Sequence, residues 1–190
     1  MESFVVSIST VGIAEMGDRT QLLSLMLAAR YRKPWTILAG VLCASLVSHA
    51  AAGVIGARLG QFLTPNLVDG IVGVSMIGMA LWTLKPDTLE AQAAGEHRTS
   101  AFVTTAVAFF IAEMGDKTQV ATAALAAGYS NLLAVIGGTT AGTLLANVPA
   151  VFAGKAFCER LPLQAIQRAA SVLFAVLGAV FLARALWYAN

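Results

Sequence analysis

The chain has 190 residues, of which 58% are hydrophobic and only 12% are charged, and its formal net charge is +2 at pH 7. Soluble domains carry about 25% charged residues, so this chain has too little charge to cover a water-exposed surface, and a soluble enzyme is close to excluded. The net charge is too small to indicate binding to nucleic acid. Cys43 and Cys158 lack the spacing of a disulfide framework or a zinc site. We therefore expect an integral membrane protein.

The apolar runs along the chain predict an all-α integral membrane protein with six transmembrane helices. A bilayer core about 30 Å thick needs roughly 20 apolar residues per helix, and short polar breaks separate six runs of suitable length. The predicted spans are approximately 4–29, 35–56, 67–84, 101–127, 132–153 and 165–187. Pro149 falls inside the fifth span and predicts a kink there. The first span is not expected to be a cleaved signal peptide, because it lacks a basic start and carries Glu15 and Asp18 in its middle.

Lysine and arginine are distributed unevenly between the two sides of the predicted membrane. With Arg19 and Lys117 set aside because they lie within spans, one side carries two basic residues, Arg58 and Arg184, and the other carries eight. The eight are Arg30, Arg32, Lys33, Lys85, Arg98, Lys155, Arg160 and Arg168. The positive-inside rule places the more basic side, with loops 1–2, 3–4 and 5–6, in the cytoplasm and both termini outside.

The chain contains an internal repeat with a shift of 98 residues. The segment IAEMGDRTQ at residues 13–21 recurs as IAEMGDKTQ at residues 111–119, with eight of nine positions identical. Each half has three predicted spans, in residues 1–84 and 101–190, joined by a predicted cytoplasmic linker at 85–100. Because three is odd, the halves enter the membrane from opposite sides and form two inverted three-helix repeats, a transporter architecture whose binding site lies at the repeat interface near mid-membrane.

Each copy of the repeated segment places two carboxylates near the middle of a span: Glu15 with Asp18, and Glu113 with Asp116. An ionised residue at that depth costs about 2.5 to 3.5 kcal/mol even on insertion scales, so these side chains are expected to face the protein interior or a water-filled cavity. In a regular helix each pair shares one face, and the inverted symmetry would bring the four carboxylates together. The glycine inside each pair permits either close helix contact or an unwound turn.

Four carboxylates in an apolar environment need protons, metal cations or basic neighbours. Arg19 and Lys117 would offset two charges, acting in charge balance or gating, and the remaining two negative charges suit one divalent cation or two protons. Oxygen ligands favour Ca²⁺, Mg²⁺ or Mn²⁺. The alternatives are purely structural i,i+4 salt bridges, Glu15 with Arg19 and Glu113 with Lys117, and simple interfacial anchoring of the two basic residues.

Six further polar residues are candidates for lining the ion site. They are Gln21, Gln119, His49, Asn147, Thr20 and Thr118. The glutamines could instead form interhelical hydrogen bonds, and the threonines lie opposite the acids on a regular helix, where they would bond a backbone carbonyl. His49, whose repeat equivalent is Asn147, is either a buried imidazole held by a neighbour or a ligand or proton carrier. As a ligand it would favour Mn²⁺.

The pattern E-x-G-D-[KR]-[ST], present at Glu15–Thr20 and at Glu113–Thr118 in a six-span chain, resembles the Gdt-type cation transporter family. That family includes bacterial manganese exporters and the Golgi transmembrane protein linked to human glycosylation defects. The resemblance covers essentially the whole chain and implies transport of Mn²⁺ or Ca²⁺ against protons, with the motif acids as metal ligands. Because the chain is shorter than eukaryotic members and lacks their targeting extension, we expect the inner (plasma) membrane of a bacterium.

The leading hypothesis is a secondary antiporter that exports Mn²⁺, or alternatively Ca²⁺, in exchange for H⁺. Its expected partners are the metal ion, protons and the lipid bilayer, with no cofactor besides the transported ion and with a homo-oligomer left open. One alternative is an exporter of a small organic cation or amino acid. A channel could use the same acids as a selectivity filter. An alternative of another class is an intramembrane hydrolase that uses an acid dyad.

Overall fold

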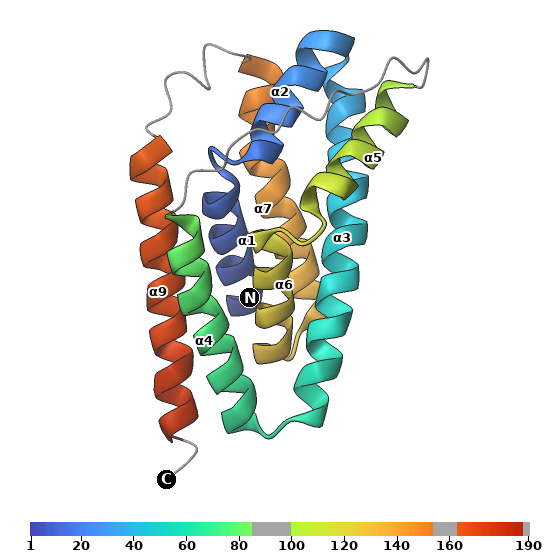
Figure 1. Ribbon diagram of the computed structural model, residues 1–190. Coiled ribbons are helices and arrows are strands. Elements are labelled where there is room, and N and C mark those ends of the chain that lie inside the picture. The colour runs from blue at the N-terminus through green and yellow to red at the C-terminus, as the bar shows by residue number, and fades with distance from the viewer. Residues whose placement is uncertain (85–99, 154–162, 188–190) are drawn as a thin grey trace.

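The structure is a computed structural model of the chain, and it describes residues 1–84, 100–153 and 163–187. Within these ranges all regular structure is helical, and the helices form an elongated bundle (Figure 1). The helices are α1 (Glu2–Glu15), α2 (Arg19–Tyr31), α3 (Pro34–Phe62), α4 (Pro65–Thr83), α5 (Ala101–Glu113), α6 (Lys117–Gly128), α7 (Leu132–Ala153) and α9 (Leu163–Trp187). The predicted linker lies outside the described residues except for Ser100, whose Oγ caps α5 by accepting the Val103 N–H at 3.3 Å. Cys158 and the predicted loop residues Lys155 and Arg160 also lie outside them.

Four of the described helices contain a stretch long and apolar enough to cross a membrane: α3, α4, Leu132–Phe152 of α7 and Arg168–Trp187 of α9. They coincide with the predicted second, third, fifth and sixth spans, and Pro149 lies inside α7. Their outer faces are apolar. Ile55, Val74 and Val172, for example, are 58%, 65% and 62% exposed. Soluble monomers rarely expose large contiguous apolar surfaces, so these faces suit contact with lipid.

The predicted first and fourth spans are each two helices separated by a break at the repeated motif. Residues 16–18 separate α1 from α2, and residues 114–116 separate α5 from α6. The chain runs in opposite directions through the two segments, because α2 continues from α1 toward the upper end of the bundle while α6 continues from α5 toward the lower end (Figure 1). The regular helix that would place Glu15 and Asp18 on one face does not form, and the unwound turn forms instead.

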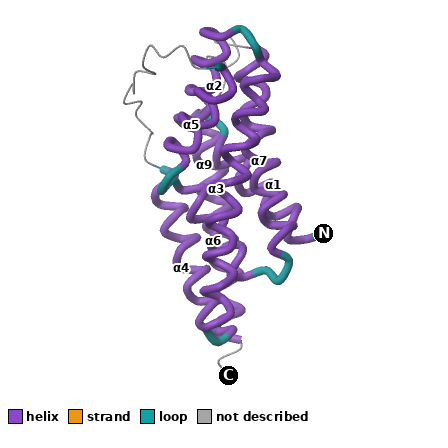
Figure 2. Tube along the Cα trace, turned by 90° about the vertical axis from the view of Figure 1, so that its right-hand side faces the viewer, coloured by secondary structure: helices purple, strands orange, loops and turns teal. Residues whose placement is uncertain are grey.

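The helices of the two halves pack in equivalent pairs. Helix α1 packs on α7 as α5 packs on α3, α2 packs on α7 as α6 packs on α3, and α2 contacts α5 while α1 contacts α6. Helices α4 and α9 lie side by side, and Phe174 and Phe181 of α9 belong to a core shared with α4 and α6. Figure 2 shows α2 and α5 at one end of the bundle and the C-terminus at the other.

Two glycines set the register in which α3 meets α5 and α7 meets α1. A Cβ added at Gly40 would lie 2.8 Å from the Thr105 Cβ, and a Cβ added at Gly138 would lie 2.8 Å from the Ser7 Cβ. Both distances are too short for any residue but glycine without movement. The shift of 98 residues relates Gly40 to Gly138 and Ser7 to Thr105. The two interfaces therefore have the same register.

Candidate functional site

The motif forms the same local structure in both halves. Gly17 and Gly115 have φ angles of 77° and 73°, a left-handed conformation that glycine adopts without steric cost. The glycine turns the chain out of the first helix, and the aspartate that follows it becomes the N-cap of the next helix. The Asp18 carboxylate accepts the Arg19 N–H at 2.9 Å, and the Asp116 carboxylate accepts the Thr118 N–H at 3.4 Å. Both aspartates are therefore fixed at helix N-termini, where negative charge is favourable.

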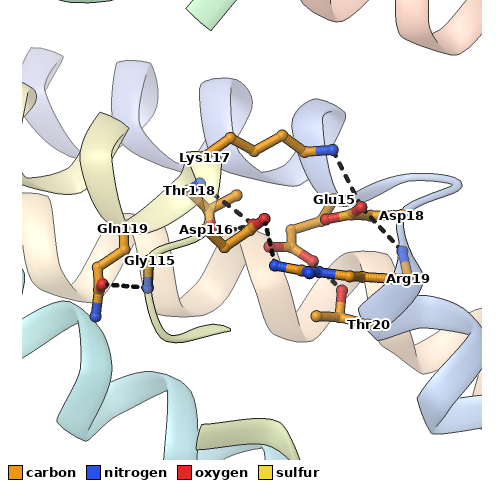
Figure 3. Close-up of polar contacts among 9 residues, drawn as sticks. All are labelled: Glu15, Asp18, Arg19, Thr20, Gly115, Asp116, Lys117, Thr118 and Gln119. Atoms are coloured by element: carbon orange, nitrogen blue, oxygen red, sulfur yellow. Dashed lines mark hydrogen bonds and ion pairs between the residues drawn. The ribbon is translucent and has the colours of Figure 1, made fainter. Parts of the chain in front are cut away.

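The two halves are joined at the breaks by crossed ion pairs. Arg19 Nη2 lies 3.1 Å from Asp116 Oδ1, and Lys117 Nζ lies 3.1 Å from Asp18 Oδ1 (Figure 3). Each cation thus pairs with the aspartate of the other half, and the i,i+4 bridges considered from the sequence are replaced by these contacts. The Lys117 side chain is only 6% exposed, whereas that of Arg19 is 40% exposed.

Three carboxylates meet beside these pairs. Oxygen atoms of Glu15, Asp18 and Asp116 all lie within 4.8 Å of one another, and all three residues are buried. Glu113 is outside this group. Its Oε1 accepts a hydrogen bond from Ser45 Oγ of α3 at 2.5 Å. The structure therefore brings together three of the four acids predicted to face one another.

The two threonines of the motif face the acids because the helix is broken. Thr20 Oγ1 donates to Glu15 Oε2 at 2.5 Å, and Thr118 Oγ1 donates to Asp116 Oδ2 at 3.2 Å (Figure 3). On a regular helix they would lie on the opposite face, as the sequence analysis expected. The hydroxyls instead hold two carboxylates in place, and each threonine has a different acid as its partner.

The two glutamines stabilise the breaks and connect them to neighbouring helices. Gln21 Oε1 accepts the Gly17 N–H and Gln119 Oε1 accepts the Gly115 N–H, both at 2.9 Å. Gln21 Nε2 donates to the Ala146 carbonyl at 2.7 Å, and Gln119 Nε2 donates to Ser48 Oγ at 3.0 Å. These are the interhelical hydrogen bonds that the sequence left open as the alternative to lining the site.

His49 and Asn147 are buried on α3 and α7, and His49 is not part of the group formed by the three carboxylates. His49 Nδ1 is 3.3 Å from Thr140 Oγ1, and its Nε2 has no hydrogen-bond partner among the described residues. Asn147 Oδ1 accepts from Ser24 Oγ at 2.5 Å, and its Nδ2 donates to the Thr143 carbonyl at 2.9 Å. Both side chains are thus held by hydroxyl-bearing neighbours.

Some polar residues inside the predicted spans were not among the predicted site residues. Ser45 and Thr143 are related by the shift of 98 residues, and this repeat was the signal that could have identified them. Asp69 of α4, which is 3% exposed, pairs with Arg184 of α9 at 3.3 Å. This pair borders a cavity of about 480 Å³ at the C-terminal end of α6, away from the motifs at its N-terminal end.

The chain is similar in sequence to known proteins over nearly its whole length. The family model described as Divalent cation/proton antiporter GDT1 matches residues 3–91 and 101–188. A Vibrio cholerae protein named "Putative manganese exporter" is 46% identical over 175 residues, which cover 92% of this chain and 87% of that protein. The Saccharomyces cerevisiae "Divalent cation/proton antiporter GDT1" is 24% identical over 238 residues, which cover 97% of this chain and 85% of that protein. No solved structure matches the chain significantly.

These matches assign the chain to transporters rather than enzymes, and the intramembrane hydrolase considered from the sequence is therefore set aside. The match covers both halves of the chain, including both copies of the motif. Two helix breaks, crossed ion pairs and a group of buried carboxylates are the features expected of an ion carrier. The chain belongs to the divalent cation/proton antiporter GDT1 family.

Proposed function

We propose that the chain exports Mn²⁺ from the cytoplasm in exchange for protons, and that Glu15, Asp18 and Asp116 hold the ion. The observation that carries this proposal is the approach of three buried carboxylates to within 4.8 Å of one another. Carboxylate oxygens are the donors that Mn²⁺, Ca²⁺ and Mg²⁺ prefer. The relative named as a manganese exporter supports Mn²⁺ as the exported ion, with Ca²⁺ as the alternative.

Arg19 and Lys117 act as internal counter-ions in this proposal. Each neutralises one aspartate at 3.1 Å, so an arriving divalent cation takes their place on Asp18 and Asp116. When the cation leaves, protons or the two basic side chains neutralise the carboxylates again, because unpaired charges are costly in an apolar interior. One site that is filled either by a metal ion or by protons is the requirement for exchange.

The membrane architecture that fits this function is a six-span protein of two inverted three-helix repeats. Three observations support it: the opposite directions of the two broken segments, the equivalent helix pairs, and the shared register at Gly40 and Gly138. With the basic loops in the cytoplasm, both termini lie outside, and the protein resides in the inner membrane of a bacterium. Alternate exposure of the site then follows from movement of one half against the other.

Transport into proteoliposomes tests the proposal directly. Mn²⁺ flux and the opposite proton flux should fall to background in Asp18→Asn and Asp116→Asn. Asp69→Asn is the matched control, because it makes the same change in a buried, ion-paired aspartate outside the site. Monodisperse elution of each variant confirms folding. Undiminished Mn²⁺ flux in both motif variants would refute the proposal. Parallel assays with Ca²⁺ and Mg²⁺ determine the preferred ion, and lysine and other amino acids test the organic-substrate alternative.

A further inference from the structure

The two motif glutamates occupy equivalent positions in the repeat but have different partners. Each is the last residue of the helix before its break. Glu15 points into the carboxylate group and accepts a hydrogen bond from Thr20 of its own half at 2.5 Å. Glu113 is not part of the group, and its Oε1 accepts a hydrogen bond from Ser45 Oγ of α3 at 2.5 Å. The sequence is symmetric at these positions, but the structure is not.

Thr143 of α7 is placed relative to Glu15 as Ser45 is placed relative to Glu113. Gly40 meets Thr105, and Ser45 lies five residues after Gly40 while Glu113 lies eight residues after Thr105. In the other interface Gly138 meets Ser7, and the same intervals lead to Thr143 and to Glu15. Because both interfaces have the same register, the Thr143 hydroxyl is the equivalent partner for Glu15.

Two buried polar atoms lack the partner that this equivalence would give them. Thr143 Oγ1 and Glu15 Oε1 have no hydrogen-bond partner among the described residues. A buried polar atom without a partner is costly, and turning Glu15 toward α7 would satisfy both atoms together. Thr118 is the repeat equivalent of Thr20, and its hydroxyl, which donates to Asp116 Oδ2 at 3.2 Å in this arrangement, would donate to Glu113 in the exchanged one.

We propose that Glu15 and Glu113 alternate in the ion site, and that Ser45 and Thr143 are the positioning residues that hold whichever glutamate is outside it. In the arrangement seen here, Glu15 joins Asp18 and Asp116, and Ser45 holds Glu113. In the exchanged arrangement, Glu113 joins the two aspartates with Thr118 as its donor, and Thr143 holds Glu15. The inference rests on the proposed function, because it assigns which carboxylates of that site are ligands in each state.

The exchange keeps the same kinds of hydrogen-bond donor at the two glutamates. Each arrangement has one glutamate bonded to a motif threonine and the other bonded to a hydroxyl on α3 or α7. Replacing one hydroxyl donor by another limits the free-energy difference between the two arrangements, and a small difference is the condition for both to be populated. Each half would then supply the glutamate ligand in one of the two states, as alternation between inverted repeats requires.

Mn²⁺ binding to the purified full-length chain tests the exchange. In Glu15→Gln, the carboxylate of Glu113 is needed to complete the site, and Ser45 opposes its entry. Adding Ser45→Ala removes a hydrogen bond to a charged group, so the exchanged arrangement becomes more populated and the dissociation constant for Mn²⁺ falls about tenfold. A structural role of Ser45 alone would leave binding the same or weaken it. If Glu15→Gln does not fold, Glu15→Ala, which also removes the carboxylate, takes its place.

Two control variants isolate the effect. Adding Thr139→Ala to Glu15→Gln removes a buried hydroxyl that donates to the Ile136 carbonyl of its own helix, and Mn²⁺ binding should not change. Adding Ser45→Ala to Glu113→Gln should not tighten binding, because the group that Ser45 holds is then no longer a carboxylate. Thermal unfolding of each variant reports stability separately from binding.

The outcomes separate this inference from the function on which it rests. Tightening confined to Glu15→Gln with Ser45→Ala supports the exchange. The exchange is refuted, and the proposed site remains, if wild type binds Mn²⁺ and Asp116→Asn does not, but adding Ser45→Ala to Glu15→Gln changes the dissociation constant for Mn²⁺ less than about threefold. Such a change is well below the free energy of a hydrogen bond to a charged group. Absence of Mn²⁺ binding by wild type overturns both.

Discussion

Removal of Lys117 should weaken the fold without metal and tighten the binding of Mn²⁺. Its ammonium group lies 3.1 Å from Asp18 Oδ1, and the two side chains are 6% and 0% exposed. Lys117→Gln leaves Asp18 buried without this cation. Arg19→Gln is the matched variant, because it removes the equivalent cation from Asp116, but the Arg19 side chain is 40% exposed. Water can therefore screen the second pair and not the first.

The magnitudes follow from these exposures. At 3.1 Å the Coulomb attraction is about 5 kcal/mol with an effective dielectric constant of 20, and breaking a buried pair by removing one partner typically costs about 3 to 5 kcal/mol. For the half-exposed pair we expect about 1 kcal/mol. Mn²⁺ no longer has to displace the lysine in Lys117→Gln, so its dissociation constant should fall about tenfold, which corresponds to about 1.4 kcal/mol of additional stabilisation at saturation.

Thermal unfolding in detergent, with and without Mn²⁺, measures these effects, and a binding titration gives the dissociation constants. Without metal, Lys117→Gln should unfold at a lower temperature than Arg19→Gln, and saturating Mn²⁺ should recover part of the difference. Transport by Lys117→Gln should slow, because the exported ion leaves a site that lacks its internal replacement. Mn²⁺ binding no tighter than in wild type, or a larger loss of stability in Arg19→Gln, would refute the reasoning.

Three further predictions concern the structure around the site, and thermal unfolding measures each. Gly115 has φ 73° and nothing within 4 Å of an added Cβ, so Gly115→Ala should cost about 1 to 2 kcal/mol from backbone strain alone, and Gly115→Asn clearly less. Equal losses would contradict this account. Gln21→Leu leaves the partly buried Gly17 N–H without its acceptor, whereas Gln119→Leu affects the exposed Gly115 N–H. Gln21→Leu should therefore lower the free energy of unfolding by about 1 to 3 kcal/mol, and Gln119→Leu should lower it by less. The reverse order would show that the side-chain amides have another role. A Cβ at Gly56 would lie 2.0 Å from the Ala123 carbonyl oxygen, whereas a Cβ at Gly78 meets nothing within 4 Å. Gly56→Ala should therefore destabilise the protein by about 1 to 3 kcal/mol, and Gly78→Ala should not. An unchanged stability of Gly56→Ala would show that α3 and α6 can separate.

The sequence was sufficient to locate the four long apolar helices and the polar centre of the protein. Hydropathy alone predicts α3, α4, α7 and α9, because uninterrupted apolar runs of that length have few other structures available. The repeat identified the motif acids as candidate site residues, because an ionised side chain in an apolar span is costly in free energy and usually has a function. Both predictions rest on solvation, which depends on composition and length more than on detailed contacts.

The geometry inside the site could not be obtained in the same way. The i,i+4 spacing of Glu15 and Arg19 suggested a local salt bridge, but the left-handed Gly17 separates the two residues onto different helices. Arg19 then pairs with a residue 97 positions away, a contact that no local spacing encodes. The position of Glu113 depends on Ser45 of another helix. Such pairings are decided by tertiary packing, and only the repeat offered a partial signal for them.

The crossed pairs also connect ion occupancy with movement of the two halves. Arg19 and Lys117 each neutralise an aspartate of the other half, so any movement that separates the breaks must break both pairs together. Breaking the buried Lys117–Asp18 pair leaves a charge uncompensated at a cost of about 3 to 5 kcal/mol, and the half-exposed Arg19–Asp116 pair adds about 1 kcal/mol, unless a divalent cation or protons have already replaced the basic side chains. An empty, unprotonated site would therefore resist the movement, whereas a loaded site would permit it. This is the physical condition for exchange without a leak of either ion.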